Sequence, residues 1–146
     1  MKIPQISVFL ENRSGRLEGV LGILAAIGAN IRALSLADTN DFGILRLIVD
    51  RPDDCVAALK AARCTVVLTD VLAVEVPDCP GGLRSILAVL AGKGLNVEYM
   101  YAFVARKTEK AIVIFRFEDA DAAIAALRDA SISVLSAETV HQLCVP

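Results

Sequence analysis

The sequence predicts an α+β protein built from two similar βαββαβ repeats, and three observations support that fold class. The glycine-containing segment at residues 12–31 recurs at residues 78–97. In both halves of the chain, apolar residues alternate as in strands or recur with helical spacing, and these patterns follow one another in the same order. The chain of 146 residues is 55% hydrophobic, which provides apolar side chains for two small cores. The matched positions are Gly15/Gly81, Leu17/Leu83, Leu21/Leu87, Leu24/Leu90, Ala25/Ala91, Gly28/Gly94 and Asn30/Asn96.

The first half of the chain shows the patterns of strand, helix, strand, strand, helix and strand. Ile6, Val8 and Leu10 alternate with other side chains as in a strand, and NRSGR then interrupts the pattern as a loop does. The next apolar residues have the spacing of one helical face, and Gly28 is suited to end that helix. We therefore expect strands at 6–10, 30–37, 43–50 and 64–68, with helices at 17–27 and 52–62.

The second half follows the same course, which is the order of the split βαβ unit of the ferredoxin-like fold. Each repeat should form an antiparallel sheet with its helices on one face, and we expect the two repeats to be packed side by side. The turn RKTEK is longer than its counterpart in the first half. The expected strands are 71–76, 95–105, 111–117 and 131–140, with one helix from Leu83 and a second at 119–130.

The junction of the repeats leaves alternatives open. We place the domains at 1–70 and 71–146, yet the run TVVLTDVLAVEV must supply the last strand of one repeat and the first of the next. Only Thr69 and Asp70 interrupt it. Both strands could be short, one continuous strand could serve both repeats, or the tail HQLCVP could fill a vacant edge by exchange.

Composition excludes several classes of function. A net charge of −2 with scattered Lys and Arg predicts neither a nucleic-acid partner nor a membrane surface. The apolar stretch from Gly19 to Ala29 is too short to span a bilayer, and the start resembles no signal peptide, so we expect a cytoplasmic protein. Four cysteines and the single His141 form no ligand or catalytic pattern, which predicts free thiols, no metal, no cofactor and no catalytic residue.

The recurring loop resembles a known signature. DCPGGL at 78–83 with GLNV at 94–97 is similar to the DRPGxL and G-hydrophobic-NI motifs of the ACT domain, a ferredoxin-like regulatory module. NRSGRL at 12–17 with GANI at 28–31 matches as well, with Ser14 where proline is usual. The resemblance covers both halves of the chain and implies a tandem ACT-domain protein.

The chemistry of the loop suits an amino acid. A glycine turn that opens a helix points backbone N–H groups at a carboxylate, while asparagine amides and an Asp78 carboxylate suit an ammonium group. Gly82 is expected to leave the second loop open. The same residues could instead serve only turn geometry and helix capping. The candidate ligand-binding residues are Asn12, Arg13, Ser14, Gly15, Leu17, Asn30, Asp78, Cys79, Pro80, Gly81, Gly82, Leu83 and Asn96.

The resemblance implies a regulatory module rather than an enzyme. ACT domains commonly bind free amino acids between two such domains, so we expect a small-molecule amino acid as ligand and regulation in trans. Because small apolar domains leave surface to cover, we also expect a homodimer. The alternative is a protein-interaction subunit that docks on a partner metabolic enzyme. In that case the ligand sites of this chain would be vestigial.

Overall fold

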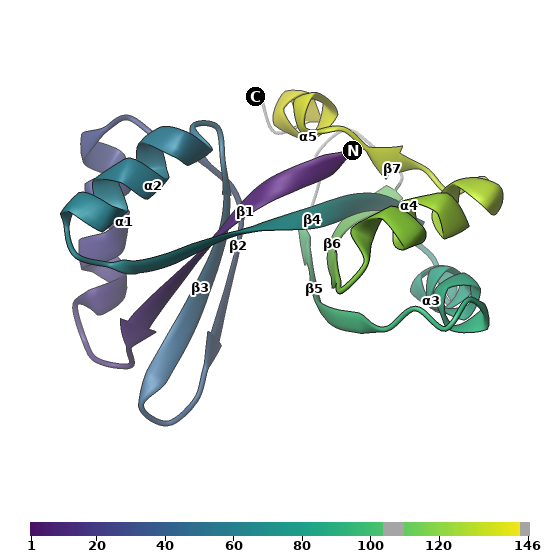
Figure 1. Ribbon diagram of the computed structural model, residues 1–146, viewed down its shortest axis with the longest axis horizontal. Coiled ribbons are helices and arrows are strands. Elements are labelled where there is room, and N and C mark those ends of the chain that lie inside the picture. Colours follow the sequence, from purple (N-terminus) through teal and green to yellow (C-terminus); the bar gives the residue numbers. More distant parts are fainter. Residues whose placement is uncertain (104–109, 144–146) are drawn as a thin grey trace. The chain divides into compact units, whose positions relative to one another are not determined.

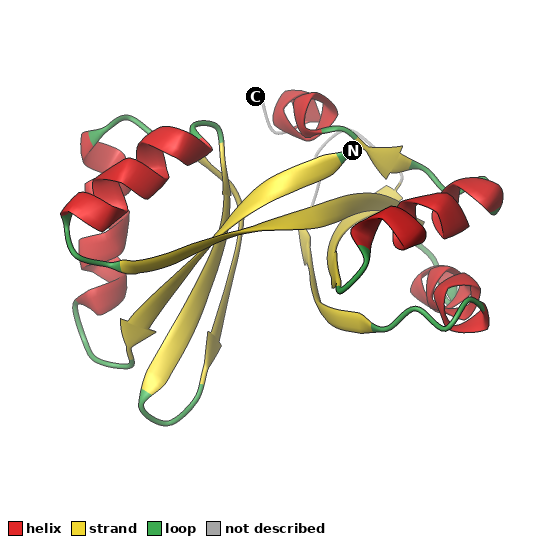
Figure 2. Ribbon diagram, viewed as in Figure 1, coloured by secondary structure: helices red, strands yellow, loops and turns green. Residues whose placement is uncertain are grey.

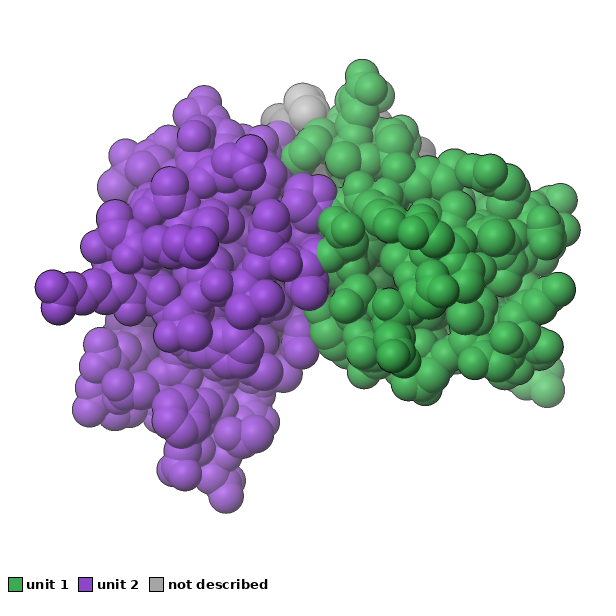
Figure 3. All heavy atoms as spheres, viewed as in Figure 1, with its two compact units in different colours: residues 1–3, 70–146 green, residues 4–69 purple. Residues whose placement is uncertain are grey.

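The computed structural model describes residues 1–103 and 110–143. They form two compact units (Figure 3): the N-terminal unit, Pro4–Thr69, and the C-terminal unit, Met1–Ile3 with Asp70–Pro146. Figures 1 and 2 show strands and helices alternating along the chain. The elements are β1 (Lys2–Glu11), α1 (Arg16–Ala26), β2 (Ile31–Asp38), β3 (Phe42–Val49), α2 (Pro52–Ala61), β4 (Thr65–Pro77), α3 (Gly82–Gly92), β5 (Val97–Phe103), β6 (Lys110–Phe117), α4 (Ala120–Asp129), β7 (Val134–Leu135) and α5 (Ala137–Leu143).

The predicted fold class is confirmed in each unit. In the N-terminal unit the strand order is β2-β3-β1-β4, and β3 is antiparallel to both of its neighbours. In the C-terminal unit the order is β4-β6-β5, and the short β7 pairs with β4. Figure 1 shows α1 and α2 on one face of the first sheet and α3 and α4 on one face of the second. Helices on one face of an antiparallel sheet define the ferredoxin-like arrangement.

The crowded junction is resolved by a single strand. β4 runs without interruption through Thr69 and Asp70, where the two compact units divide. β4 neighbours β1 in the sheet, and its last six residues pair with β6 from Leu72↔Phe115 to Pro77↔Lys110. The alternative of one continuous strand is therefore the one that the molecule adopts. The domain boundary after residue 70 stays a prediction.

The two cores are built from equivalent positions. Ile6 and Leu24 are buried in the N-terminal core, and their counterparts Leu72 and Leu90 are buried in the C-terminal core. Duplication has thus preserved the packing as well as the loop. The complete set of matched core pairs is Ile6/Leu72, Val8/Val74, Leu10/Val76, Val20/Ile86, Leu24/Leu90, Leu45/Val113, Leu47/Phe115, Val49/Phe117, Cys55/Ala123 and Leu59/Leu127.

The predicted last strand at 131–140 is wrong over most of its length. Only Val134 and Leu135 form a strand, and α5 follows. The hydroxyl oxygen of Ser136 accepts a hydrogen bond from the amide of Thr139 at 3.1 Å, which caps the helix. Val140 is fully buried, so tertiary packing stabilises this short helix. Cys144 and residues 106–109 of the predicted turn RKTEK, at 106–110, lie outside the described residues. Lys110 begins β6.

Candidate functional site

Both predicted loops end in the same backbone conformation. Gly15 precedes α1 with φ 83° and ψ −12°, and Gly81 precedes α3 with φ 84° and ψ −5°. This left-handed region favours glycine because a Cβ is strained there. No side chain caps either helix. The amides of Arg16 and Gly82 donate to the carbonyls of Arg13 and Cys79, which leaves the following first-turn amides without an intrahelical partner at the positive end of the helix dipole. Each loop therefore has the donors that a carboxylate requires.

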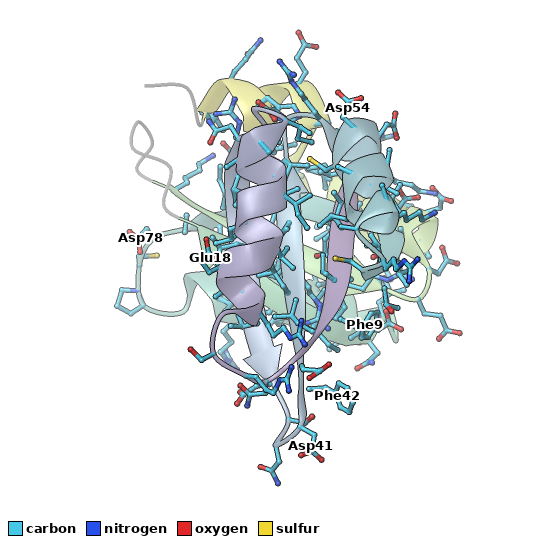
Figure 4. The ribbon with its side chains drawn as sticks, turned by 90° about the vertical axis from the view of Figure 1, so that its left-hand side faces the viewer. Phe9, Glu18, Asp41, Phe42, Asp54 and Asp78 are labelled. Atoms are coloured by element: carbon cyan, nitrogen blue, oxygen red, sulfur yellow. The ribbon has the colours of Figure 1, made fainter. Side chains whose placement is uncertain are left out.

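The first loop is tied to the hairpin between β2 and β3. The amide of Asn12 donates to the Asp41 carbonyl at 3.0 Å, and its side chain lies 3.5 Å from the Thr39 carbonyl. The predicted Asn12 side chain is thus already engaged in holding the loop. Figure 4 shows Asp41 at the tip of this hairpin. Ser14 is exposed in the loop, and Leu17 is half-buried against the N-terminal core.

The arginines of the first loop share one carboxylate. Glu11 at the end of β1 lies 2.9 Å from the Arg13 guanidinium and 3.6 Å from that of Arg16. All three side chains are about half exposed, so solvent screens these pairs and each contributes little to stability. Two cations against one anion leave the loop with a net positive charge.

The second loop has an open rim and a closely packed base. Asp78, Cys79 and Pro80 are exposed, and Figure 4 shows Asp78 on this loop. Gly82 corrects a prediction, because it is buried and a Cβ there would collide with the Pro77 backbone. Its glycine serves the close approach of helix and strand, not an open loop.

Hydrogen bonds fix the second loop from within. The amide of Cys79 donates to the Pro77 carbonyl at 2.9 Å, and the amide of Gly82 donates to the Cys79 carbonyl at 3.0 Å. The Ser85 hydroxyl donates to the Gly82 carbonyl at 2.7 Å. Leu83 is half-buried against the C-terminal core and anchors the first turn of α3.

The predicted asparagines are not brought to the loop of their own repeat. Asn30 precedes β2 at the level of Val49, whereas the loop follows β1 at the level of Phe42. Seven steps along β3 separate the two levels, about 20 Å at a strand rise of roughly 3.3 Å. Asn96 precedes β5 at the level of Phe117 and is remote from its loop in the same way. The amide of Asn30 donates to the Asp50 carboxylate at 2.9 Å.

A groove beside each loop was not predicted. The first, of about 480 Å³, is lined by the end of β1, the start of α1 and the turn between α2 and β4. The second, of about 370 Å³, occupies the equivalent place in the other repeat. The first-groove residues Phe9 and Phe42 correspond to Glu75 and Lys110 in the second. Sequence periodicity contains no signal for such a groove, because its walls come from four separate segments, with Phe42 supplied by the start of β3.

Three of the four cysteines lie in the described part of the chain. Cys55, Cys64 and Cys79 are free, as predicted. Burial, followed by the nearby Asp50 and Asp54 carboxylates, raises the pKa of the Cys55 thiol.

Residues 1–103 and 110–143 contain no cluster of three metal-ligating side chains. Within the same ranges, every helix is too short or too polar to cross a membrane.

Comparisons with known proteins identify the architecture. The structure of protein BT0572 from Bacteroides thetaiotaomicron is 39% identical, with a TM-score of 0.90 over 97% of this chain and 96% of that one. The regulatory subunit of aspartate kinase from Thermus thermophilus is 20% identical, with a TM-score of 0.62 over 87% of this chain and 91% of its own. The latter likeness shows the fold. No curated protein matches the chain.

A family model covers almost the whole sequence. The model described as "ACT domain pair" matches residues 1–144. The matched cores, the left-handed glycines in the matched pairs Gly15/Gly81 and Gly28/Gly94, and the continuous β4 describe the same duplication in atomic terms. The chain therefore belongs to the ACT domain pair family.

Proposed function

We propose that this ACT domain pair is a regulatory protein, without catalysis of its own, that binds a free amino acid at an interface between ACT domains and acts in trans on a partner. The observation that carries the proposal is the recurrence of an uncapped helix start behind a left-handed glycine, at Gly15 and at Gly81. Such a start favours a carboxylate through its amides and its dipole. The similar fold of an aspartate kinase regulatory subunit supports the regulatory role.

The second loop is the better candidate for the ammonium group of the ligand. Asp78 is exposed and belongs to no ion pair among the described residues, so its carboxylate is available. In the first loop Asn12 is engaged with the hairpin, and two arginines dominate the charge. We therefore assign the amino acid first to the loop at 78–82.

The asparagine of each repeat lies far from the loop of its own repeat. Asn96 lies at the far end of its own repeat, about 20 Å from the loop by strand rise. We propose that Asn30 or Asn96 of one copy approaches a loop of a second copy, which is consistent with the predicted homodimer. The cytoplasmic location belongs to the same proposal.

A thermal-shift screen against the twenty amino acids tests the site. A ligand that binds only the folded state raises the melting temperature by mass action. We expect a selective rise for one or a few amino acids, and loss of that rise in Asp78→Ala. Asp129→Ala, which removes an exposed carboxylate of the same unit, is the matched control and should retain the rise. Absence of a rise at millimolar concentration would favour the docking subunit with vestigial sites.

A further inference from the structure

The groove of the N-terminal repeat has acquired a lining that its duplicate lacks. We name the set Phe9, Phe42, Arg16 and Arg63 the corner groove, since it lies where β1 ends beside α1. The equivalent positions of the second repeat are Glu75, Lys110, Gly82 and Ser131, of which Glu75, Lys110 and Ser131 line the second groove. The two grooves share one backbone arrangement but have different side chains, which indicates that they bind different molecules.

The two phenylalanines are exposed on one face of the sheet. Phe9 pairs with Ile44, and Phe42 lies two residues from Ile44, so both side chains project at diagonal positions to the side opposite the core residues Leu10 and Leu45. Both residues line the groove where the strands end. Their exposed fractions are 44% and 60%, so neither ring is packed in the hydrophobic core. Figure 4 shows both at the hairpin end of the unit. In the second groove the corresponding Glu75 and Lys110 satisfy each other in an ion pair of 3.2 Å.

Arg63 occupies a backbone conformation that arginine disfavours. Its φ is 61°, and its counterpart Ser131 has φ 57° at the end of α4. Both turns close in the same way, with the amide of the next residue donating to Leu59 or Leu127 at 2.9 Å. Glycine or asparagine would fit this position with less strain. An arginine is retained here although no described residue forms an ion pair with it.

The charge of the corner groove is positive. Arg16 and Arg63 contribute two guanidinium groups, and Glu11 is the single carboxylate in the lining. Arg13 lies 2.9 Å and Arg16 lies 3.6 Å from Glu11, so the three side chains together carry one net positive charge beside Arg63. Guanidinium groups bind carboxylates through paired hydrogen bonds, while exposed aromatic rings favour a flat apolar body. A volume of about 480 Å³ falls within the range of small-molecule sites, roughly 300–1,000 Å³.

We propose that the corner groove binds a small aromatic carboxylate, with Arg63 and Arg16 holding the carboxylate and Phe9 and Phe42 contacting the ring. This site goes beyond the proposed amino-acid site, because it needs no ammonium group and uses no residue of the loop at 78–82. The N-terminal repeat thus provides a second input of different chemistry.

Isothermal titration of the whole chain with 3-phenylpropionate tests the site. We expect saturable binding of one equivalent, with weaker binding of the neutral 3-phenylpropanamide and of the non-aromatic hexanoate. Phe42→Thr and Arg63→Gly should each weaken the affinity about tenfold or more, the loss expected for a charge-assisted hydrogen bond or a ring contact. Ser131→Gly, the same change in the equivalent turn, is the matched control and should bind as the wild type does.

The variants also separate the competing explanations. Arg63→Gly relieves the strained turn, so its melting temperature should not fall, and lost affinity then reports the missing guanidinium. Retained affinity in Arg63→Gly, or no binding of 3-phenylpropionate by the wild type, overturns the proposal. If Phe42→Thr dissociates the protein in sedimentation while the probe affinity is unchanged, the phenylalanines serve self-association and the proposal is also overturned. Asp78→Ala should leave this affinity unchanged, which keeps the two sites distinguishable.

Discussion

Gly82 lies directly against the backbone carbonyl of Pro77, so the start of α3 touches the end of β4. No other glycine in the described chain has backbone so close to the place of its missing side chain. The contact sets the entry angle of the second loop, since Cys79 and Gly82 are hydrogen-bonded around it. Gly82 is therefore a packing residue at the base of the candidate site.

Substitution Gly82→Ala should destabilise the protein by about 2 kcal/mol or more, because a Cβ would force backbone apart. Gly92→Ala in the same helix is the matched control. No atom lies near its Cβ, and alanine is the better helix former, so stability should stay equal or rise by up to about 1 kcal/mol. Urea unfolding of both variants measures the difference. Equal midpoints would show that the close approach is not maintained in solution.

Gly15→Ala and Gly81→Ala should each destabilise their unit by about 1 kcal/mol, since both positions have a φ near 84° and open space for a methyl group. The cost comes from the backbone alone. Asparagine, which tolerates this region better, should restore part of the loss at either position. Thermal unfolding of the four variants checks the expectation. A large loss at one glycine and none at the other would mean that the two loops are not conformationally equivalent.

The sequence predicted the elements well where a pattern recurred. Leu17 and Leu24 have counterparts in Leu83 and Leu90, and two copies of one helical face are stronger evidence than either alone. The continuity of β4 was left open because Thr69 and Asp70 resemble a break, although a strand accepts polar residues wherever its face is solvated.

Long-range geometry explains what was missed. α5 depends on the burial of Val140, which no local pattern records, although Ser136 was a usable capping signal. The distance of Asn96 from its own loop has a directional reason. The helix runs antiparallel to the strand before it, so the residues before and after the helix lie at opposite ends of the strands. The corner groove requires four segments to meet, and only the fold brings them together.

α2 and α4, the second helices of the two repeats, differ in their N-terminal caps. One cap substitution should therefore lower stability and another should raise it. The Asp119 carboxylate accepts from the amide of Ala122 at 2.9 Å, whereas Arg51 at the equivalent start of α2 caps nothing. Asp119→Ala should therefore cost about 1 kcal/mol, and Arg51→Ser should stabilise by about 0.5–1 kcal/mol. Serine avoids a further negative charge beside Asp50. Urea midpoints measure both changes. No gain from Arg51→Ser would mean that the new hydroxyl does not reach the first-turn amides.

Cys55 should make stability depend on pH in the alkaline range. Burial and the Asp50 and Asp54 carboxylates raise the pKa of this thiol in the folded state. The unfolded chain therefore releases the proton at lower pH than the folded chain. The stability contributed by the neutral Cys55 thiol is fully present below roughly pH 8.5, the ordinary thiol pKa. It is lost as pH rises towards the folded pKa, by up to about 1.4 kcal/mol per pH unit.

Cys55→Ala isolates this contribution, because alanine is the residue at the equivalent core position, Ala123. The variant should lose about 1–2 kcal/mol at pH 7 through the smaller side chain. Above pH 9 its stability should fall less steeply than that of the wild type, so the two curves converge. Urea unfolding at pH 7, 8, 9 and 10 measures the slopes. Parallel curves would show that the thiol does not ionise differently in the folded and unfolded states, and that the Cys55 pocket admits the charge without penalty.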